Sequence, residues 1–277
     1  MEELTARLCR TLLPRRRPDG HKGTFGKVAV VGGAVGYTGA PVYAGEAAVR
    51  TGSGLVFVGV PAAVYPIVAA RCDAAMAYPL PGDAAAVREK LEGCDAVLLG
   101  PGLGGAPQAR ALALGLLAEL TCPVVLDADG INAAAPHIDV LKARRGPTVV
   151  TPHEVEFSRL GGDISAGREA AAVRFAAETG CITVLKGPGT LVAAPDGRVR
   201  QNTTGSDALA KGGTGDVLAG MVLSLIGQGA SPYDAASLAV WLHGRAGDLC
   251  ERRLTAYGVT PGDLVREIPA AIRELLE

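Results

Sequence analysis

A glycine-rich turn that leads into a helix is the segment of this sequence best suited to phosphoryl chemistry. Residues 211–216 read KGGTGD, and apolar residues at helical spacing follow them from Val217 to Leu225. Such a turn exposes backbone amides at the positive end of the helix dipole, where an anionic phosphoryl group binds. Asp216 would face that anion as a proton acceptor, although an aspartate at a helix start also serves as a simple N-cap. Lys211 is either a phosphate contact or a solvent-exposed side chain.

Five further loops follow apolar, strand-like segments, which is where open α/β sheets bind their ligands. They comprise residues 32–39, 100–105, 127–132, 151–156 and 186–190. In the fourth of them, His153 and Glu156 are either site residues or the polar first turn of a helix that begins after Pro152. The last loop reads KGPGT, and its glycines would let a nucleotide approach the backbone closely, or form an ordinary turn.

One glycine pattern supports a different class of enzyme. Gly100, Gly102 and Gly105 form GxGxxG between a strand and a helix, and Asp127 follows after about twenty residues, as in the dinucleotide-binding fingerprint. A nicotinamide-dependent oxidoreductase is therefore a rival. Hydride transfer would, however, leave residues 32–39 and the KGGTGD turn without a role. The sequence contains no GxxxxGK[ST] motif, which disfavours a P-loop nucleotidase.

The elements that must position these loops are short apolar strands separated by alanine-rich helices. Continuously apolar strands are typical of a parallel sheet covered on both faces, so the pattern predicts a three-layer α/β/α domain. A hairpin around residues 195–197, flanked by strands at 190–193 and 198–201, is expected at the sheet edge. The expected strands are residues 27–31, 55–60, 96–99, 124–126, 148–150 and 183–185, and the clearest helices are 40–50, 106–120 and 167–178.

Composition and charge restrict the class of partner. The 277-residue chain is 48% hydrophobic but only 4% aromatic, and its formal net charge of −1 argues against nucleic acid or anionic lipid. Its longest apolar segment, residues 217–226, falls short of the ~20 residues that cross a bilayer. The six cysteines show no metal or disulfide spacing, and no signal peptide is recognisable, so we expect reduced thiols and a single cytoplasmic domain over residues 1–277.

Residues 210–220 are similar to those of the NAD(P)H-hydrate dehydratases, and their GTGD core resembles the anion-hole and catalytic-base motif of ribokinase-like kinases. The match to the dehydratases continues through residues 22–54, 99–104, 125–132, 148–160, 186–190 and 241–249. It thus covers nearly the whole chain, and the combination is specific although no single motif is. The resemblance implies a ribokinase-like α/β/α fold with a mostly parallel central sheet.

The resemblance also implies roles for individual residues. Asp216 would be the catalytic base, beside an anion hole formed by Gly213, Thr214 and Gly215. Glu156 matches the glutamate of the kinases' NxxE pair, which helps to hold magnesium through water, whereas His153 replaces the asparagine and would contact the substrate. Substrate contacts are expected at Ala40, Gly102, Gly104, Asn132, His153 and Asp216, and nucleotide contacts at Lys186, Gly187, Pro188, Gly189, Thr190 and Gly215.

The implied reaction is ADP-dependent dehydration of the S form of hydrated NADH or NADPH, with Mg²⁺, giving NAD(P)H, AMP and phosphate. The resemblance further implies a homo-oligomer, a tetramer by analogy with bacterial members, and cooperation with a separate NAD(P)H-hydrate epimerase. A vitamin kinase acting on a thiazole or pyrimidine alcohol would use the same anion hole and base, but it would accumulate a stable phosphorylated product. A noncatalytic nucleotide sensor is the remaining alternative.

Overall fold

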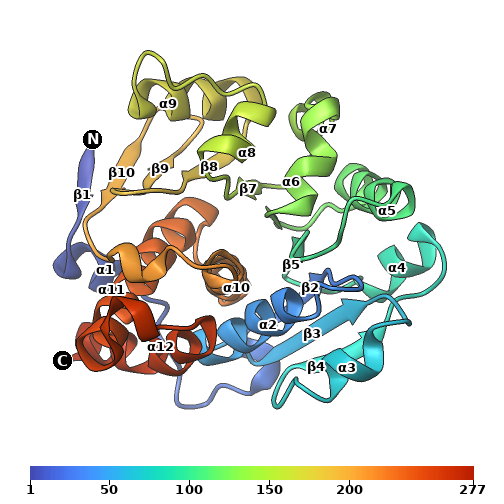
Figure 1. The fold of residues 1–277 in the computed structure, drawn as a ribbon, viewed down its shortest axis with the longest axis horizontal. Helices are drawn as coiled ribbons and strands as arrows, with labels where there is room; N and C mark the ends of the chain where they lie inside the picture. The colour runs from blue at the N-terminus through green and yellow to red at the C-terminus, as the bar shows by residue number, and fades with distance from the viewer.

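The central sheet of the computed structural model, which describes residues 1–277, has ten strands in the order β1-β10-β9-β8-β7-β6-β5-β2-β3-β4 (Figure 1). All neighbouring strands are parallel except β9, which is antiparallel to both β8 and β10. The predicted mostly parallel sheet is therefore confirmed. The strands are β1 Glu2–Leu4, β2 Lys27–Val31, β3 Leu55–Val60, β4 Met76–Pro79, β5 Ala96–Leu99, β6 Val124–Leu126, β7 Thr148–Val150, β8 Ile182–Leu185, β9 Leu191–Ala193 and β10 Val199–Asn202.

The predicted hairpin is present, but its expected place at the sheet edge is wrong. Strands β9 and β10 pair as an antiparallel hairpin, and β1 then pairs in parallel with the outer side of β10. Leu4 is fully buried, and the Arg200 guanidinium of β10 donates to the Glu2 carboxylate at 2.9 Å. The N-terminal segment thus forms one edge of the sheet, and β4 forms the other.

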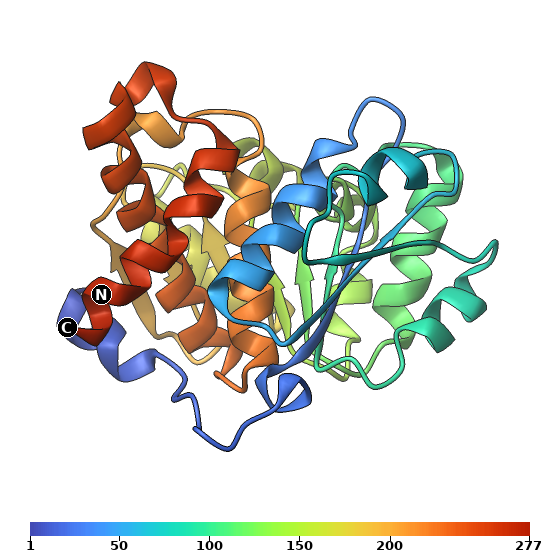
Figure 2. The ribbon, with the colours of Figure 1, turned by 90° about the horizontal axis from the view of Figure 1, so that it is seen from below.

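Helices cover both faces of the sheet, so the expected three layers are confirmed (Figures 1 and 2). One face packs against α1, α2, α3, α10, α11 and α12, and the other against α4 to α9. The helices are α1 Ala6–Leu12, α2 Gly39–Thr51, α3 Tyr65–Ala69, α4 Ala84–Lys90, α5 Pro107–Glu119, α6 Asp129–Ala134, α7 Asp139–Lys142, α8 Glu154–Arg159, α9 Arg168–Thr179, α10 Thr214–Gly227, α11 Pro232–Gly258 and α12 Pro261–Leu276, with short 3₁₀ helices at Lys22–Phe25, Ala135–His137 and Asp207–Leu209.

The strands are apolar throughout because their side chains alternate between two hydrophobic cores. In β2, Val28 and Val30 belong to the core beneath α10 and α11, whereas Ala29 and Val31 belong to the core beneath α5 and α9. This double burial explains why the six central strands could be predicted from continuous apolar runs.

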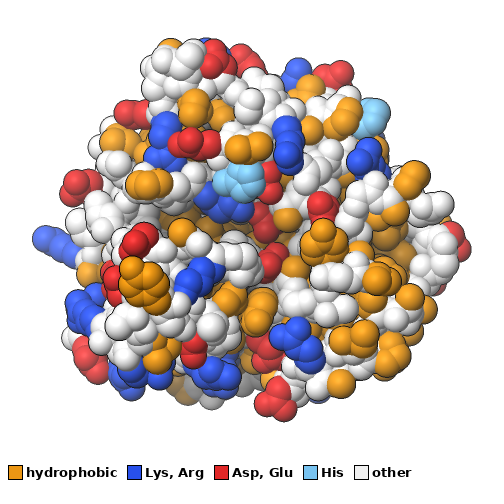
Figure 3. Space-filling view, viewed as in Figure 1, with side chains coloured by type: hydrophobic (Ala, Val, Ile, Leu, Met, Phe, Trp, Pro, Cys, Tyr) orange, Lys and Arg blue, Asp and Glu red, His pale blue; other side chains and the backbone are white.

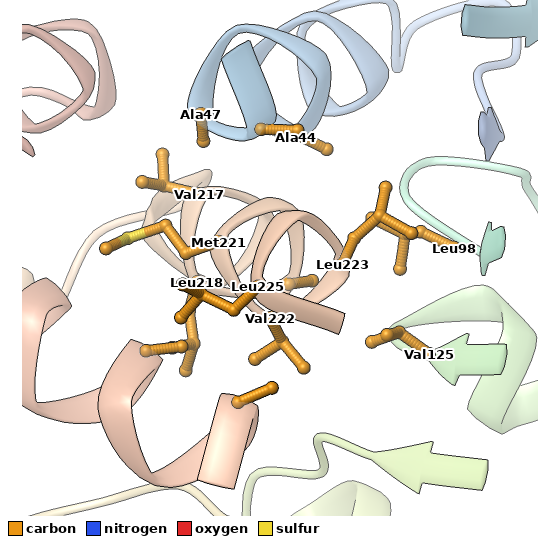
Figure 4. Close-up of a cluster of buried hydrophobic side chains, with 14 of the residues drawn as sticks. Ala44, Ala47, Leu98, Val125, Val217, Leu218, Met221, Val222, Leu223 and Leu225 are labelled. Atoms are coloured by element: carbon orange, nitrogen blue, oxygen red, sulfur yellow. The ribbon is translucent and has the colours of Figure 1, made fainter. Parts of the chain in front are cut away.

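Helix α10 is packed between α2 and the sheet (Figure 4). Val217 points toward α2, and Leu223 lies against Leu98 of β5. A Cβ atom on Gly220 would come within 2.1 Å of the Ala44 carbonyl oxygen, so the glycine lets the two helices approach closely. Burial of a large apolar side chain such as Leu223 stabilises the folded protein by roughly 1.5–3 kcal/mol. The packing fixes α10, and with it the position of the glycine-rich turn at its N-terminus.

No helix combines the length and apolar character needed to span a membrane. The six cysteines form no disulfide, as expected, and four of them are buried: Cys9, Cys94, Cys181 and Cys250. Burial raises the pKa of the Cys9 thiol to about 12, so that thiol stays protonated and unreactive.

Candidate active site

The loops that follow the parallel strands meet at one edge of the sheet, beside the N-terminus of α10 (Figure 1). They begin directly after β2, β5, β6, β7 and β8, as predicted from the sequence. Figure 3 views the molecule from the same side and shows acidic, basic and histidine side chains gathered around a central hollow. This carboxyl edge of the sheet is therefore the candidate active site.

The turn before α10 presents unpaired backbone amides. Gly213 caps the helix in the left-handed region, at φ 98°, and the amides of Gly213, Gly215 and Asp216 have no hydrogen-bond partner within the protein. Thr214 differs from the expectation, because its amide donates to the Lys211 carbonyl at 3.3 Å and its hydroxyl to the carbonyls of the same turn. Free amides at the positive end of a helix dipole are suited to binding an anion, so we call this turn the candidate anion site.

Lys211 does not contact this anion site. Its ammonium group donates to the carbonyl oxygens of Tyr257 and Val259, at 2.7 and 2.6 Å, and so ties the turn to the C-terminal end of α11. The side chain is thus a structural tether, a role that was not predicted from the sequence.

The pKa of Asp216 says most about the chemistry of the site. Burial, followed by the neighbouring charge of Asp127, raises the pKa of its carboxyl group from 3.8 to about 7, although the Lys186 ammonium acts in the opposite direction. Asp129 and Glu156 add smaller effects that also raise the pKa. A carboxyl group with a pKa near neutrality accepts a proton readily when a substrate hydroxyl loses one.

A partly buried lysine contacts two of the acids that affect the pKa of Asp216. The Lys186 ammonium lies 3.1 Å from the Asp127 carboxylate and 3.7 Å from that of Glu156. Burial acts to lower the pKa of Lys186, but these two carboxylates outweigh it and keep the pKa above its usual value. The side chain therefore stays charged, close to where a Cβ atom on Gly215 would lie. Its charge is available to a phosphate held at the anion site.

Asp127 is a site residue that sequence reasoning assigned only to the oxidoreductase alternative. Its side chain is 2% exposed and accepts hydrogen bonds from the Thr151 hydroxyl and the Lys186 ammonium. Ala128, the next residue, has φ 48° and ψ −115°, a strained conformation that is typical of functional loops. Gly100 passes so close to the Asp127 carbonyl that a Cβ atom would lie 1.9 Å from the oxygen. Its position directly after an apolar strand was the available signal for this acid.

His153 and Glu156 form a capping box at the start of α8. Nδ1 of His153 accepts from the amides of Val155 and Glu156, and the Glu156 carboxylate accepts from the His153 amide at 2.9 Å. The ring itself is half exposed toward the site, so capping and substrate contact are compatible.

The expected nucleotide residues line one pocket, of about 680 Å³, which we call the glycine-loop pocket. Its walls include the whole loop 186–190 together with Thr214 and Gly215. Sequence reasoning missed His243 in this pocket. Nε2 of His243 lies 2.9 Å from the Thr214 carbonyl, and burial lowers the pKa of the ring to about 4, so the ring is neutral and donates to that carbonyl. The contact joins α11 to α10, and because the two residues are 29 positions apart, no local sequence pattern could predict it.

Two of the expected substrate residues line a different pocket. Gly104 and Asn132 line a second pocket of about 560 Å³, which we call the arginine pocket because Arg110 and Arg159 also line it. Asp129, in the same wall, accepts from the Gly104 amide at 2.8 Å. Gly102 adjoins Ala40: a Cβ atom on the glycine would lie 3.0 Å from that of Ala40. The structure thus brings Gly104 and Asn132 together at Asp129, and Gly102 together with Ala40.

The acidic groups do not form a ready metal cage, because no cluster of three or more histidine, cysteine or carboxylate groups is positioned to hold an ion. The Oε2 atom of Glu156 accepts from the His153 amide and lies 3.7 Å from the Lys186 ammonium, and its Oε1 lies 3.6 Å from Nε2 of His153. Magnesium, which keeps several waters and binds mainly to substrate phosphates, fits such a site only through a water molecule on Glu156.

Comparison with known proteins gives a consistent result. A family model described as NAD(P)H-hydrate dehydratase matches residues 28–270. The chain is 40% identical to the bifunctional NAD(P)H-hydrate repair enzyme of Moorella thermoacetica, over 99% of this chain and 54% of that protein. It is 39% identical to the ADP-dependent (S)-NAD(P)H-hydrate dehydratase of Neisseria meningitidis, over 94% of this chain and 88% of that protein. The chain therefore spans about half the length of the bifunctional relatives that it matches.

A solved structure matches along the whole chain. The ADP/ATP-dependent NAD(P)H-hydrate dehydratase from Bacillus subtilis, co-crystallised with ATP and Mg²⁺, aligns with a TM-score of 0.86 and 30% identity. The alignment covers 99% of this chain and 98% of that chain.

Proposed function

Because the chain belongs to the NAD(P)H-hydrate dehydratase family, we propose that it dehydrates the S form of hydrated NADH or NADPH with ADP as phosphoryl donor. The products would be NAD(P)H, AMP and phosphate. The chain has the ribokinase-like fold of this family, and as a dehydratase it is a lyase. The observation that carries the proposal is Asp216, a carboxyl group with a pKa of about 7 that directly follows the free amides of the turn before α10.

The hydrated ring holds a hydroxyl, which is a poor leaving group. Asp216 removes the hydroxyl proton while the oxygen attacks the terminal phosphorus of ADP, so the bond to AMP breaks as the new O–P bond forms. The ring nitrogen then donates its electron pair, the C–O bond breaks, and phosphate leaves with the original hydroxyl oxygen. Loss of a ring proton completes the dihydronicotinamide. The amides of Gly213 and Gly215, joined by that of Asp216, stabilise charge on the transferred group.

The residues of the glycine-loop pocket would hold ADP, with loop 186–190 against the nucleotide and the Lys186 ammonium near its phosphates. Magnesium would supply charge neutralisation between those phosphates, held to the protein by Glu156 through water. His153 would contact the hydrated nicotinamide with its exposed ring, while its Nδ1 keeps the cap on α8.

We further propose that residues 1–277 act as one domain, because a single sheet joins the first strand to the last hairpin. A homo-oligomer, tetrameric as the resemblance to bacterial dehydratases implies, and a cytoplasmic location remain predictions. A separate epimerase would convert the R form of the hydrate into the S form, as the bifunctional name of the longer relatives suggests.

Recovery of dihydronicotinamide absorbance from chemically hydrated NADH tests this function. We expect recovery to require both a nucleotide and Mg²⁺, with ADP faster than ATP and one AMP formed per NADH. Equal rates without nucleotide would contradict phosphoryl transfer. Accumulation of a stable phosphorylated product without recovered absorbance would instead favour a small-molecule kinase.

A further inference from the structure

Two arginines of the arginine pocket have no carboxylate partner. The side chain of Arg110 makes no hydrogen bond or ion pair within the protein, and Arg159 donates only to the Asn132 side-chain oxygen, at 2.9 Å. Elsewhere in the chain, arginines such as Arg200 and Arg245 are paired with carboxylates at close range. Two unpaired guanidinium groups in one pocket leave a net positive charge there.

The acid in this pocket does not cancel that charge at the pocket surface. Asp129 accepts from the Gly104 amide with one oxygen and from the Asn132 side chain with the other, at 2.8 and 3.3 Å. Both oxygens therefore have protein donors, and Asn132 links Asp129 to Arg159 in one chain of hydrogen bonds. This chain orients one guanidinium toward the pocket that Arg110 also lines. Guanidinium groups bind phosphate through two parallel hydrogen bonds.

The arginine pocket and the glycine-loop pocket share no residue, yet both approach Asp216. Gly215, its neighbour in sequence, lines the glycine-loop pocket. Asp129 of the arginine pocket lies two residues from Asp127, whose carboxylate is 3.1 Å from the Lys186 ammonium beside Gly215. A hydrated nicotinamide at Asp216 carries a ribose, a pyrophosphate and an adenosine that need space away from ADP. A pocket of about 560 Å³ has the size of a small-molecule site.

We propose that Arg110 and Arg159 form a subsite for the phosphate groups of the hydrated dinucleotide, across Asp216 from the ADP pocket. This inference rests on the proposed function and names the part of the substrate that the arginine pocket recognises. The phosphate is either the pyrophosphate, which NADH and NADPH share, or the 2′-phosphate, which only NADPH carries. The subsite would hold the dinucleotide without taking part in phosphoryl transfer.

The test is to substitute R110Q and R159Q, singly and together, and to titrate NADH and NADPH while following dihydronicotinamide fluorescence, which needs no turnover. We expect about a tenfold weaker Kd in the double variant, with less dependence of Kd on salt than in the parent. KM for the hydrated substrate should rise in parallel, while kcat and KM for ADP stay within about twofold. R145Q is the matched control, because Arg145 is an exposed, unpaired arginine in a pocket remote from Asp216.

Weaker binding of both dinucleotides assigns the subsite to the pyrophosphate, and weaker binding of NADPH alone assigns it to the 2′-phosphate. Unchanged Kd and KM in the double variant, with normal turnover in the parent, overturns the subsite but leaves the proposed function intact. A parent protein that binds dinucleotides through these arginines but never converts the hydrate supports the subsite and overturns the function.

Discussion

Replacing Asp216 by Asn separates a catalytic base from an acid that only stabilises the first turn of α10, because Gly213 and not Asp216 is the N-cap of this helix. Asn has nearly the same shape as Asp, but it cannot accept the hydroxyl proton. Loss of general-base catalysis typically costs ~10²–10⁴ in rate, so turnover should fall by about that factor while ADP binding is retained. In the parent, kcat should rise with pH through about 7, because the base must be ionised.

The same substitution should stabilise the protein, and the size of the effect follows from the pKa. In the folded protein this pKa is about 7 instead of 3.8, and each tenfold change in protonation corresponds to about 1.4 kcal/mol. Ionising Asp216 in the fold thus costs about 4 kcal/mol. Between these pH values the folded state binds more protons than the unfolded state, so the stability of the parent falls as pH rises. The stability advantage of Asp216→Asn should grow by about 2–3 kcal/mol between pH 5 and pH 8.5.

Urea unfolding at the two pH values, combined with turnover at saturating ADP and hydrated NADH, measures both effects. Asp234→Asn is the matched control, because Asp234 is also the third residue of its helix. Burial acts against ionisation there, but hydrogen bonds from Arg200 and Ser231 outweigh it and lower the pKa of Asp234. The control should lose stability at neutral pH and keep its turnover. Turnover of Asp216→Asn within a few-fold of the parent, without a pH-dependent gain in stability, would refute the assignment.

Three further substitutions test other parts of the site. His153→Asn keeps a cap on α8, so it should raise KM for the hydrated substrate with little loss of stability in urea unfolding. His153→Ala should raise KM and also lower the free energy of unfolding by ~1 kcal/mol. Equal KM values in the Asn variant and the parent would exclude substrate contact. Lys186→Gln removes the charge that lowers the pKa of Asp216, so the acidic limb of the pH–rate profile should move to higher pH; an unmoved limb would show that another group titrates. Gly213→Ala places a Cβ atom on a backbone at φ 98° and 2.7 Å from Pro261, so it should distort the turn that holds the free amides. Added inorganic phosphate should then no longer raise the melting temperature, and a melting temperature that still rises with phosphate would contradict the anion site.

Much of the fold could be predicted because its signals are local. Strands such as β2 and β5 are continuously apolar, and the loops after them were correctly expected to share one edge of the sheet. Strands β1 and β4 were missed. Only Leu4 of β1 is buried, and the partner of β1 lies 198 residues away, so its position depends on tertiary pairing alone. The hairpin was placed at the edge for the same reason.

The loops that form the site could be predicted from the sequence, but the pKa values of their side chains could not. The glycine turn and the acid of KGGTGD could be read from the sequence, since both the amides and the carboxyl group belong to one helix start. The pKa of Asp216 depends on charges from other loops, namely Asp127 and Lys186, which only the fold brings together. His243 was missed because it lies within a 27-residue helix and looks like any buried histidine.

The origin of the phosphate oxygen tests the central claim, phosphoryl transfer to the substrate hydroxyl, most directly. NADH hydrated in ¹⁸O-labelled water carries the label on that hydroxyl, and the reaction is run in ordinary water with ADP and Mg²⁺. Attack of the hydroxyl on the terminal phosphorus, followed by C–O cleavage, predicts one ¹⁸O atom in each phosphate released, detectable by mass spectrometry. Unlabelled phosphate, with the label released as water, would contradict the mechanism and show that ADP hydrolysis and dehydration are separate events.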